Sequence, residues 1–270
     1  MTIHQRLFDK YLDILKVEFS SPTFESLRKI VKAHLVKIPF ENISKLYYKK
    51  RRVLNIPDLS AFLSGIENFN FGGTCYTNNY YLYTLLEHLG YKIKLCGADM
   101  KSPDVHLISI VTIDEQEYII DCGYAAPFFN PLPRNLNEDY IISFGEEKYI
   151  VKPKDELDRT KVEQYNNGKL QHWYTAKPQR RKIGEFAKVI EDSYADDATF
   201  MNAVRITKYT EKGSIVLKNL YLTETTGSQY STIKIELKNI PSIVQEKFGM
   251  PANIVEEAIS SINDLKDIYD

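Results

Sequence analysis

The stretch Phe71-Gly72-Gly73-Thr74-Cys75 decides how this chain is interpreted, because it leads directly into the clearest helix of the sequence. Downstream of it, leucines recur at positions 82, 85, 86 and 89, which is the spacing of one helix face, and Gly90 supplies a stop. The paired glycines allow the backbone to bend sharply before the helix. The pattern therefore predicts that Cys75 lies at a helix N-terminus.

A thiol at a helix N-terminus experiences the positive end of the helix dipole, which favours the nucleophilic thiolate. Free cysteines are also among the most buried side chains, so a structural role in the core is the alternative interpretation of Cys75. The two glycines beside it favour chemistry, since they let a backbone N–H group and a substrate approach closely. Cys75 is the candidate nucleophile of the chain.

A predicted hairpin brings a histidine and an aspartate together downstream of this helix. His106 opens an apolar strand, and a second strand from Tyr118 returns after a turn at Asp114-Glu115. With a two-residue turn, His106 faces Gly123, and Asp121 is its diagonal neighbour within hydrogen-bonding reach. A carboxylate in an apolar strand needs a partner, and we expect His106 to be that partner.

These residues complete a known catalytic logic. Cys75 attacks, His106 takes its proton, and Asp121 fixes the tautomer of the ring and stabilises the imidazolium. On the residues alone, a core cysteine with an unrelated histidine and aspartate remains the alternative. The other cysteines and histidines are assigned no chemical role. We expect Cys96 and Cys122 to pack in strands. We expect the histidines to be structural or at the surface: His34, His88 and His172.

The composition is that of an ordinary globular chain of 270 residues. Hydrophobic residues make up 43% and charged residues 26%, which excludes disorder as the main state. With 35 basic and 36 acidic residues, the net charge of −1 argues against nucleic-acid and membrane-surface partners. No signal peptide, membrane span, zinc-type spacing or disulfide framework is recognisable. We expect a cytoplasmic protein without a metal site.

The periodicity changes along the chain from helical to strand-like and back. Helices are predicted at residues 7–19 and 24–36, from about residue 57, from residue 76 and within 240–270. Strands begin at residue 91, with hairpin turns at residues 114–117, 166–168 and 211–213. Helices followed by strands and then by mixed elements predict an α+β fold.

Four segments resemble motifs of the arylamine N-acetyltransferase family. Ile38–Ile43 is similar to the family's Pro-Phe-Glu-Asn-Leu, and Gly72–Cys75 with Asn79 is similar to its active-site motif Arg-Gly-Gly-x-Cys-x-Glu/Gln-x-Asn. Val111–Asp114 continues the family's histidine strand, and Tyr118–Tyr124 is similar to its Asp-Val-Gly-Phe segment. The matches occur in the family's order across the first half of the chain, and the second half matches more loosely.

The resemblance implies a three-part architecture with a core shared by papain-like and transglutaminase-like enzymes. Its parts are an N-terminal helical bundle (residues 1–90), a central β-barrel (91–195) and a C-terminal α/β lid (196–270). The resemblance also implies that Cys75, His106 and Asp121 form the catalytic triad.

For function, the resemblance implies a ping-pong acyltransferase of xenobiotic metabolism. Acetyl-coenzyme A is the implied acyl donor, and an arylamine, arylhydrazine or N-hydroxyarylamine is the implied acceptor. Tyr124 stands where the family usually has a Phe that lines the acceptor pocket, and Phe40 and Val105 are weaker candidates for that pocket. The sequence leaves open the physiological acceptor, the acyl chain, the coenzyme A contacts and whether the protein is a monomer or a homo-oligomer.

Two positions depart from the family's pattern. Phe71 replaces the Arg before Gly-Gly, and Thr77 replaces the Glu or Gln two residues after the cysteine. Because Glu41 loses its family partner, either it finds another cation or the Cys75 loop is held differently. Two alternative functions follow: a cysteine hydrolase or amide synthase on the same triad, and a catalytically weakened relative that binds ligands.

Overall fold

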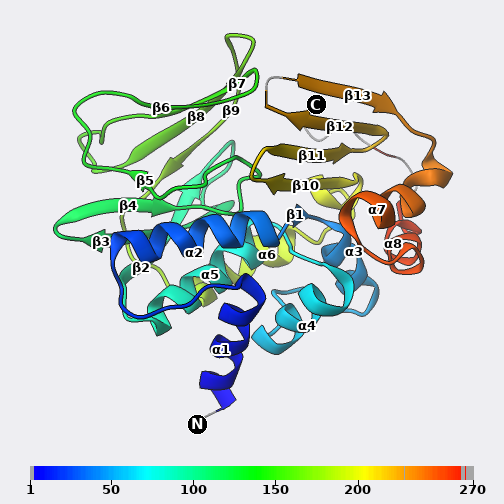
Figure 1. The fold of residues 1–270 in the computed structure, drawn as a ribbon, viewed down its shortest axis with the longest axis horizontal. Helices are drawn as coiled ribbons and strands as arrows, with labels where there is room; N and C mark the ends of the chain where they lie inside the picture. Colours follow the sequence, from blue (N-terminus) through cyan, green and yellow to red (C-terminus); the bar gives the residue numbers. More distant parts are fainter. Residues whose placement is uncertain (1–2, 228, 263–264, 266–270) are drawn as a thin grey trace.

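The structure, a computed structural model, describes residues 3–227, 229–262 and 265. It has the predicted α+β fold, in which helices pack against a barrel-like sheet and a second sheet lies beside it (Figure 1). The α-helices are α1 (Ile3–Leu15), α2 (Phe24–Lys37), α3 (Ile43–Lys50), α4 (Leu59–Phe69), α5 (Cys75–His88), α6 (Ala187–Asp192), α7 (Ile240–Phe248) and α8 (Ala252–Ile259). The strands are β1 (Phe40–Glu41), β2 (Lys92–Asp99), β3 (His106–Ile113), β4 (Gln116–Ile120), β5 (Leu132–Pro133), β6 (Tyr140–Phe144), β7 (Glu147–Val151), β8 (Thr160–Asn166), β9 (Lys169–Ala176), β10 (Arg205–Thr210), β11 (Gly213–Lys218), β12 (Tyr221–Thr226) and β13 (Gln229–Lys234).

The helix starts follow capping chemistry that the sequence shows in part. Thr23 caps α2 by accepting a hydrogen bond from the Ser26 N–H. The helix predicted from Pro57 begins two residues later at Leu59, because Asp58 caps it by accepting from the Ala61 N–H at 2.8 Å. The C-terminal return to helix is confirmed by α7 and α8, and residues 263–264 and 266–270 of that prediction lie outside the described residues.

Helix α5 carries the predicted nucleophile at its first turn. Cys75 is its first residue and Thr74 is its N-cap, so the predicted helix start is confirmed. Gly90 follows the C-cap Leu89 with φ of 85°, a left-handed conformation that favours glycine. The helix packs against β2 and β3, which places the N-terminus of α5 beside the barrel-like sheet (Figure 1).

The barrel-like sheet has the antiparallel order β5-β4-β3-β2-β9-β8-β7-β6. In its β3–β4 hairpin, Ile113 pairs with Gln116 and Ser109 pairs with Ile120, which confirms the predicted hairpin and shows that its turn has two residues, Asp114 and Glu115. Both turn residues, Asp114 and Glu115, have positive φ, as the twist of a tight hairpin requires. The pairing ends at Ile120, so Asp121 leaves the ladder and its side chain is available for other contacts.

The second sheet takes its first strand from the N-terminal third of the chain. Its order is β1-β10-β11-β12-β13, and Phe40 of β1 pairs with Thr207 of β10. The sequence predicted only helices before residue 91, because a two-residue strand leaves no periodic signal. Strand β1 therefore links the helical region to the C-terminal sheet, whose other edge strand is β13 (Figure 1).

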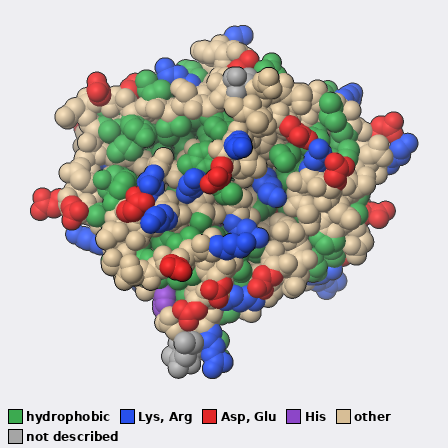
Figure 2. Space-filling view, in the orientation of Figure 1, with side chains coloured by type: hydrophobic (Ala, Val, Ile, Leu, Met, Phe, Trp, Pro, Cys, Tyr) green, Lys and Arg blue, Asp and Glu red, His purple; other side chains and the backbone are tan. Residues whose placement is uncertain are grey.

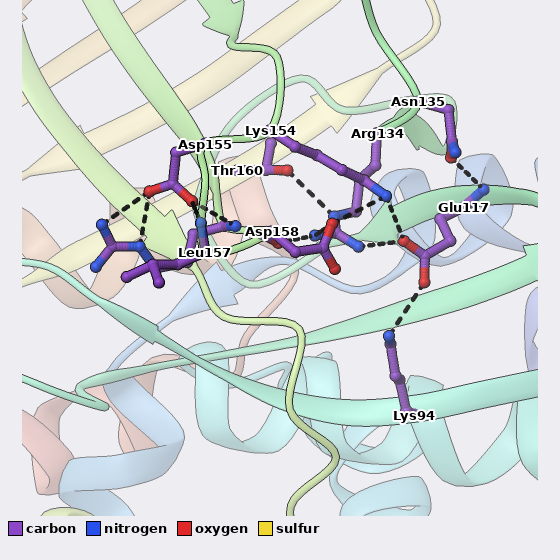
Figure 3. A network of polar contacts seen from close by, with 10 residues as sticks. Lys94, Glu117, Arg134, Asn135, Lys154, Asp155, Leu157, Asp158 and Thr160 are labelled. Atoms are coloured by element: carbon purple, nitrogen blue, oxygen red, sulfur yellow. Dashed lines mark hydrogen bonds and ion pairs between the residues drawn. The ribbon is translucent and has the colours of Figure 1, made fainter.

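A buried ion network fastens the outer part of the barrel-like sheet (Figure 3). Arg134 is fully buried and pairs with Glu117, which also accepts from Lys94 at 3.1 Å and Lys154 at 2.9 Å. The Arg134 Nε donates to Thr160 Oγ1 at 3.1 Å. Burial by itself would raise the pKa of Glu117. The three cations outweigh burial, and the pKa falls below its ordinary value, to about 2.

Elsewhere the surface is mixed in charge. On the face shown in Figure 2, basic and acidic side chains are interspersed rather than segregated. No helix in the described part of the chain is long and apolar enough to cross a membrane.

We predict that Glu117→Gln lowers the free energy of unfolding by about 2–4 kcal/mol at pH 7, because the buried Arg134 loses its closest anion and keeps only Asp158, at 3.7 Å. Since folding lowers the pKa of Glu117, this difference is full above about pH 5 and fades as the pH falls toward about 2. Urea denaturation measures it, with the exposed Glu115→Gln as control. Equal effects of the two variants would show that the network contributes no stability.

Candidate active site

The carboxylate of Asp121 is the most heavily hydrogen-bonded group of the site. It is 2% exposed, and its Oδ2 lies 2.8 Å from His106 Nε2. Its Oδ1 accepts from Asn79 Nδ2 at 2.8 Å and from the Gly123 N–H at 3.0 Å. Donors from α5, from β3 and from the chain after β4 therefore fix one carboxylate.

The imidazole of His106 lies between this carboxylate and the thiol. Because Nε2 faces Asp121, Nδ1 remains for Cys75, whose side chain hydrogen-bonds the ring. Burial lowers the pKa of His106, but the Asp121 carboxylate and the Cys75 thiolate outweigh burial and raise it well above its ordinary value. The structure thus brings together the three residues that the sequence singled out, with the imidazole able to carry a proton at neutral pH.

Two glycines allow the close packing around the nucleophile. A Cβ on Gly72 would lie 1.9 Å from the Pro39 carbonyl oxygen, and a Cβ on Gly123 would lie 2.5 Å from Cys75 Cα. Neither position can hold a larger residue without moving backbone. The nucleophile loop is therefore in direct contact both with the segment before β1 and with the segment that follows Asp121.

Asn79 is a positioning residue. From the sequence it was identified only as part of the active-site motif, with no role assigned. It lies four residues after Cys75 on α5, and so on the same helix face. Besides its bond to Asp121, its Oδ1 accepts from the Cys122 N–H at 2.8 Å and its Nδ2 donates to the Leu107 carbonyl. The four-residue spacing between Cys75 and Asn79 places both side chains on one helix face, and this spacing is the sequence signal for a role of Asn79 beside the nucleophile.

Aromatic rings form one wall beside His106. The Tyr124 ring lies 5.6 Å from the His106 ring and 4.9 Å from the Tyr174 ring, between centroids. The Tyr124 hydroxyl lies 2.7 Å from Nδ1 of His172. Burial, with the charges of His106 and Lys101, lowers the pKa of His172 to about 4, so this ring is neutral and its Nδ1 accepts a hydrogen bond from the Tyr124 hydroxyl.

His172 was predicted to be structural or at the surface, and its hydrogen bond to the Tyr124 hydroxyl in this wall is a structural role. The pairing of β9 with β2 brings β9 close to His106, a neighbourhood that sequence spacing does not show. His34 and His88 fit the prediction, since His34 hydrogen-bonds Tyr11 and His88 stacks on Phe8.

Phe40 and Val105, the other two predicted pocket residues, lie on elements that contact the nucleophile loop. Phe40 forms a β-bridge with Gly73 and its ring packs on Phe200 at 5.6 Å. The Val105 carbonyl accepts from the Tyr76 hydroxyl at 3.1 Å, directly before His106. Both therefore flank the start of α5, while Tyr124 lies against the imidazole.

The structure shows how Glu41 is accommodated although Phe71 replaces the arginine of the family's motif. Glu41 is fully buried, and its carboxylate accepts from the Gly72 N–H at 3.0 Å and from the Ser44 N–H at 2.8 Å. Backbone donors therefore satisfy it, and the loop is held without an arginine. Phe71 packs among the rings of Tyr47, Tyr48 and Phe69.

The other thiols differ from Cys75 in their surroundings. Burial raises the pKa of Cys96 to about 12 and that of Cys122 well above its ordinary value. All three cysteines are free, and both of these lie outside the contacts of His106. Among the described residues, no group of three or more potential metal ligands gathers.

We predict that Glu41→Ala lowers the free energy of unfolding by about 2–4 kcal/mol, because two buried N–H groups lose their acceptor. Glu41→Gln keeps one amide oxygen and should cost about half as much. Urea denaturation of both variants checks this. Costs for both below about 0.5 kcal/mol would mean that Glu41 does not anchor the nucleophile loop.

A cysteine at a helix start, in contact with a histidine and an aspartate of a barrel-like sheet, resembles the core arrangement of papain-like enzymes. Comparison with known proteins places the chain more narrowly. The sequence model of the N-acetyltransferase family matches residues 23–256, which is most of the chain. The chain therefore belongs to the arylamine N-acetyltransferase family.

Individual relatives agree with this placement. Proansamycin X synthase of Amycolatopsis mediterranei is 27% identical over 183 residues, covering 63% of this chain and 66% of that protein. The pineal gland arylamine N-acetyltransferase NAT-3 of Gallus gallus is 30% identical over 118 residues, covering 41% and 39%. The matches thus span less than two thirds of either relative.

Similarity of structure extends further than similarity of sequence. The Mycobacterium marinum arylamine N-acetyltransferase, solved in complex with CoA, superposes with a TM-score of 0.78 over 94% of this chain and 99% of that chain. At 19% identity this likeness establishes the fold: helical N-terminal part, barrel-like sheet and α/β lid. The division at residues 90 and 195 stays a prediction.

Proposed function

We propose that this chain transfers an acetyl group from acetyl-coenzyme A, through Cys75, to the nitrogen of an arylamine, arylhydrazine or N-hydroxyarylamine. The observation that carries the proposal is the contact of Cys75 with an imidazole whose far nitrogen is held by Asp121. Membership of the family supports the choice of acyl transfer among the reactions that such a triad performs.

In the acylation step, the Cys75 thiolate attacks the thioester carbonyl. The new S–C bond forms as the bond between the acetyl carbon and the coenzyme A sulfur breaks, and His106 gives its proton to the leaving thiolate. Asp121 stabilises the imidazolium before this transfer and holds the ring in place after it. Because the side chains around His106 are buried, water has little access to the resulting acetyl-cysteine.

In the second step the neutral His106 acts as a base on the acceptor nitrogen. The N–C bond forms, the S–C bond breaks, and the proton of the nitrogen passes to His106, which restores the thiolate–imidazolium pair. Tyr124, Phe40 and Val105 are the proposed walls of the acceptor site, since they lie against the imidazole and on both sides of the nucleophile loop. A flat aromatic amine suits a wall built from rings.

Coenzyme A is proposed as the partner because a relative of the same fold was solved in complex with CoA. The proposed reaction uses no metal. A cytoplasmic location stays a prediction from the sequence, and the three free cysteines are in keeping with a reducing compartment.

The second candidate is acyl transfer to another acceptor, either water or an amine within the acyl substrate itself. It is favoured by the relative named a synthase rather than an acetyltransferase. The two candidates share acylation of Cys75 and differ in what resolves the acyl-cysteine; resolution by an internal amine also requires an acyl group larger than acetyl, one that carries the amine.

We predict that acetyl-coenzyme A without an acceptor adds one acetyl group to the wild-type protein, as seen by intact mass, and that Cys75→Ser gains none. Cys96→Ala, which removes another buried thiol, should still be acetylated. Adding an arylamine should then remove the acetyl group and yield the N-acetyl product.

Loss of the acetyl group at the same rate with and without amine would favour the hydrolase. Acetylation of the Cys75→Ser variant would remove Cys75 from the mechanism. A wild-type protein that stays unmodified would favour the weakened ligand-binding relative.

A further inference from the structure

We propose that Lys45 is a second cation of the catalytic centre, whose buried ammonium group balances the negative charge of the Cys75 thiolate. The inference rests on the proposed function, because it assigns Lys45 a task only if Cys75 reacts as a thiolate. Lys45 acts through Cys75 and is therefore a positioning residue.

The first observation is that Lys45 is buried without an anion. It lies in α3 and is 6% exposed. Its Nζ donates to Ser193 Oγ at 2.6 Å and lies 4.5 Å from the centre of the Tyr194 ring, contacts that carry no negative charge. No carboxylate among the described residues forms an ion pair with it, and a buried ammonium group without a counter-charge is costly.

The second observation is that Lys45 lies against the loop that carries the nucleophile. The Lys45 Nζ lies 5.9 Å from the ring of Tyr76, the residue that follows Cys75. Lys45 also shares a cavity of about 10 Å³ with Gly73, Thr74 and Tyr76, the residues on both sides of Cys75. This volume holds about one water molecule.

Most charged groups around Lys45 and Cys75 are already paired with a group of opposite charge. Burial lowers the pKa of Lys45 to about 8, the Cys75 charge opposes this fall, and Lys49 adds to it. Lys49 itself pairs with Asp196 at 2.7 Å. Other titratable groups around the two side chains include the neutral phenols of Tyr76 and Tyr194, the His106–Asp121 pair and, beside Tyr76, Asp104, which is paired with Lys177 and Arg181. The buried Glu41 carboxylate also lies at this loop, where the Gly72 and Ser44 N–H groups donate to it.

The count of charges gives the reason for a second cation. With Cys75 as thiolate, Asp121 ionised and His106 protonated, the centre carries one excess negative charge, which Lys45 cancels. After acylation the thiolate charge is gone and His106 has given up its proton, so Lys45 balances Asp121. The four groups Cys75, His106, Asp121 and Lys45 together are therefore neutral before and after the transfer, which lowers the cost of burying their charges.

The test is the pH dependence of Cys75 alkylation by iodoacetamide, read at Cys75 by peptide mass. In Lys45→Met, the midpoint of the pH–rate profile should rise by about one pH unit, and the rate at about pH 6 should fall about tenfold. Lys50→Met, at the exposed end of the same helix, should leave the profile in place. An unshifted profile in a folded Lys45→Met protein would overturn the inference.

A reciprocal measurement does not depend on whether the Lys45 variant folds. If the two charges interact, Cys75→Ser must lower the pKa of Lys45 by the amount that Lys45→Met raises the alkylation midpoint, and NMR of labelled lysine measures this. A Lys45 pKa unchanged by Cys75→Ser would overturn the inference alone. A wild-type Cys75 that reacts at about pH 6 no faster than an ordinary thiol would instead overturn the proposed function.

Discussion

The buried carboxylate of Asp121 is the constraint on which the site depends. It accepts hydrogen bonds from His106, from Asn79 and from the Gly123 N–H, and so joins β3, α5 and the chain that follows β4. A buried carboxylate is costly unless such donors surround it, so the same contacts that make it tolerable also fix their relative positions. The orientation of the imidazole toward Cys75 follows from this arrangement.

A second anchored carboxylate holds the other side of the nucleophile. The Glu41 carboxylate accepts hydrogen bonds from the N–H groups of Gly72 and Ser44, and the strand that carries Glu41, β1, pairs with β10 of the second sheet. The start of α5 is thus connected to the barrel-like sheet through Asp121 and to the second sheet through Glu41. Backbone N–H groups satisfy the Glu41 carboxylate. Phe71, at the position where the family's motif has an arginine, is therefore compatible with an ordered nucleophile loop.

Local patterns predicted much of this arrangement. The leucine spacing and the glycine pair placed Cys75 at a helix start, and the two-residue turn was enough to place Asp121 diagonally from His106. What depends on closure of the sheets could not be predicted. Strand β1 is too short for a periodic signal, and His172 reaches the site only because β9 pairs with β2. The burial of Lys45 likewise depends on α3, α5 and α6 packing together, which no local pattern shows.

The central claim is that Asp121 keeps His106 protonated beside Cys75. NMR of ¹⁵N-labelled histidine, followed from about pH 5 to about pH 9, tests it most directly. The account predicts that the His106 ring stays an imidazolium through neutral pH in the wild-type protein, and that Asp121→Asn lowers its pKa. A His106 that titrates at or below its ordinary value of about 6.5 in the wild-type protein would contradict the account.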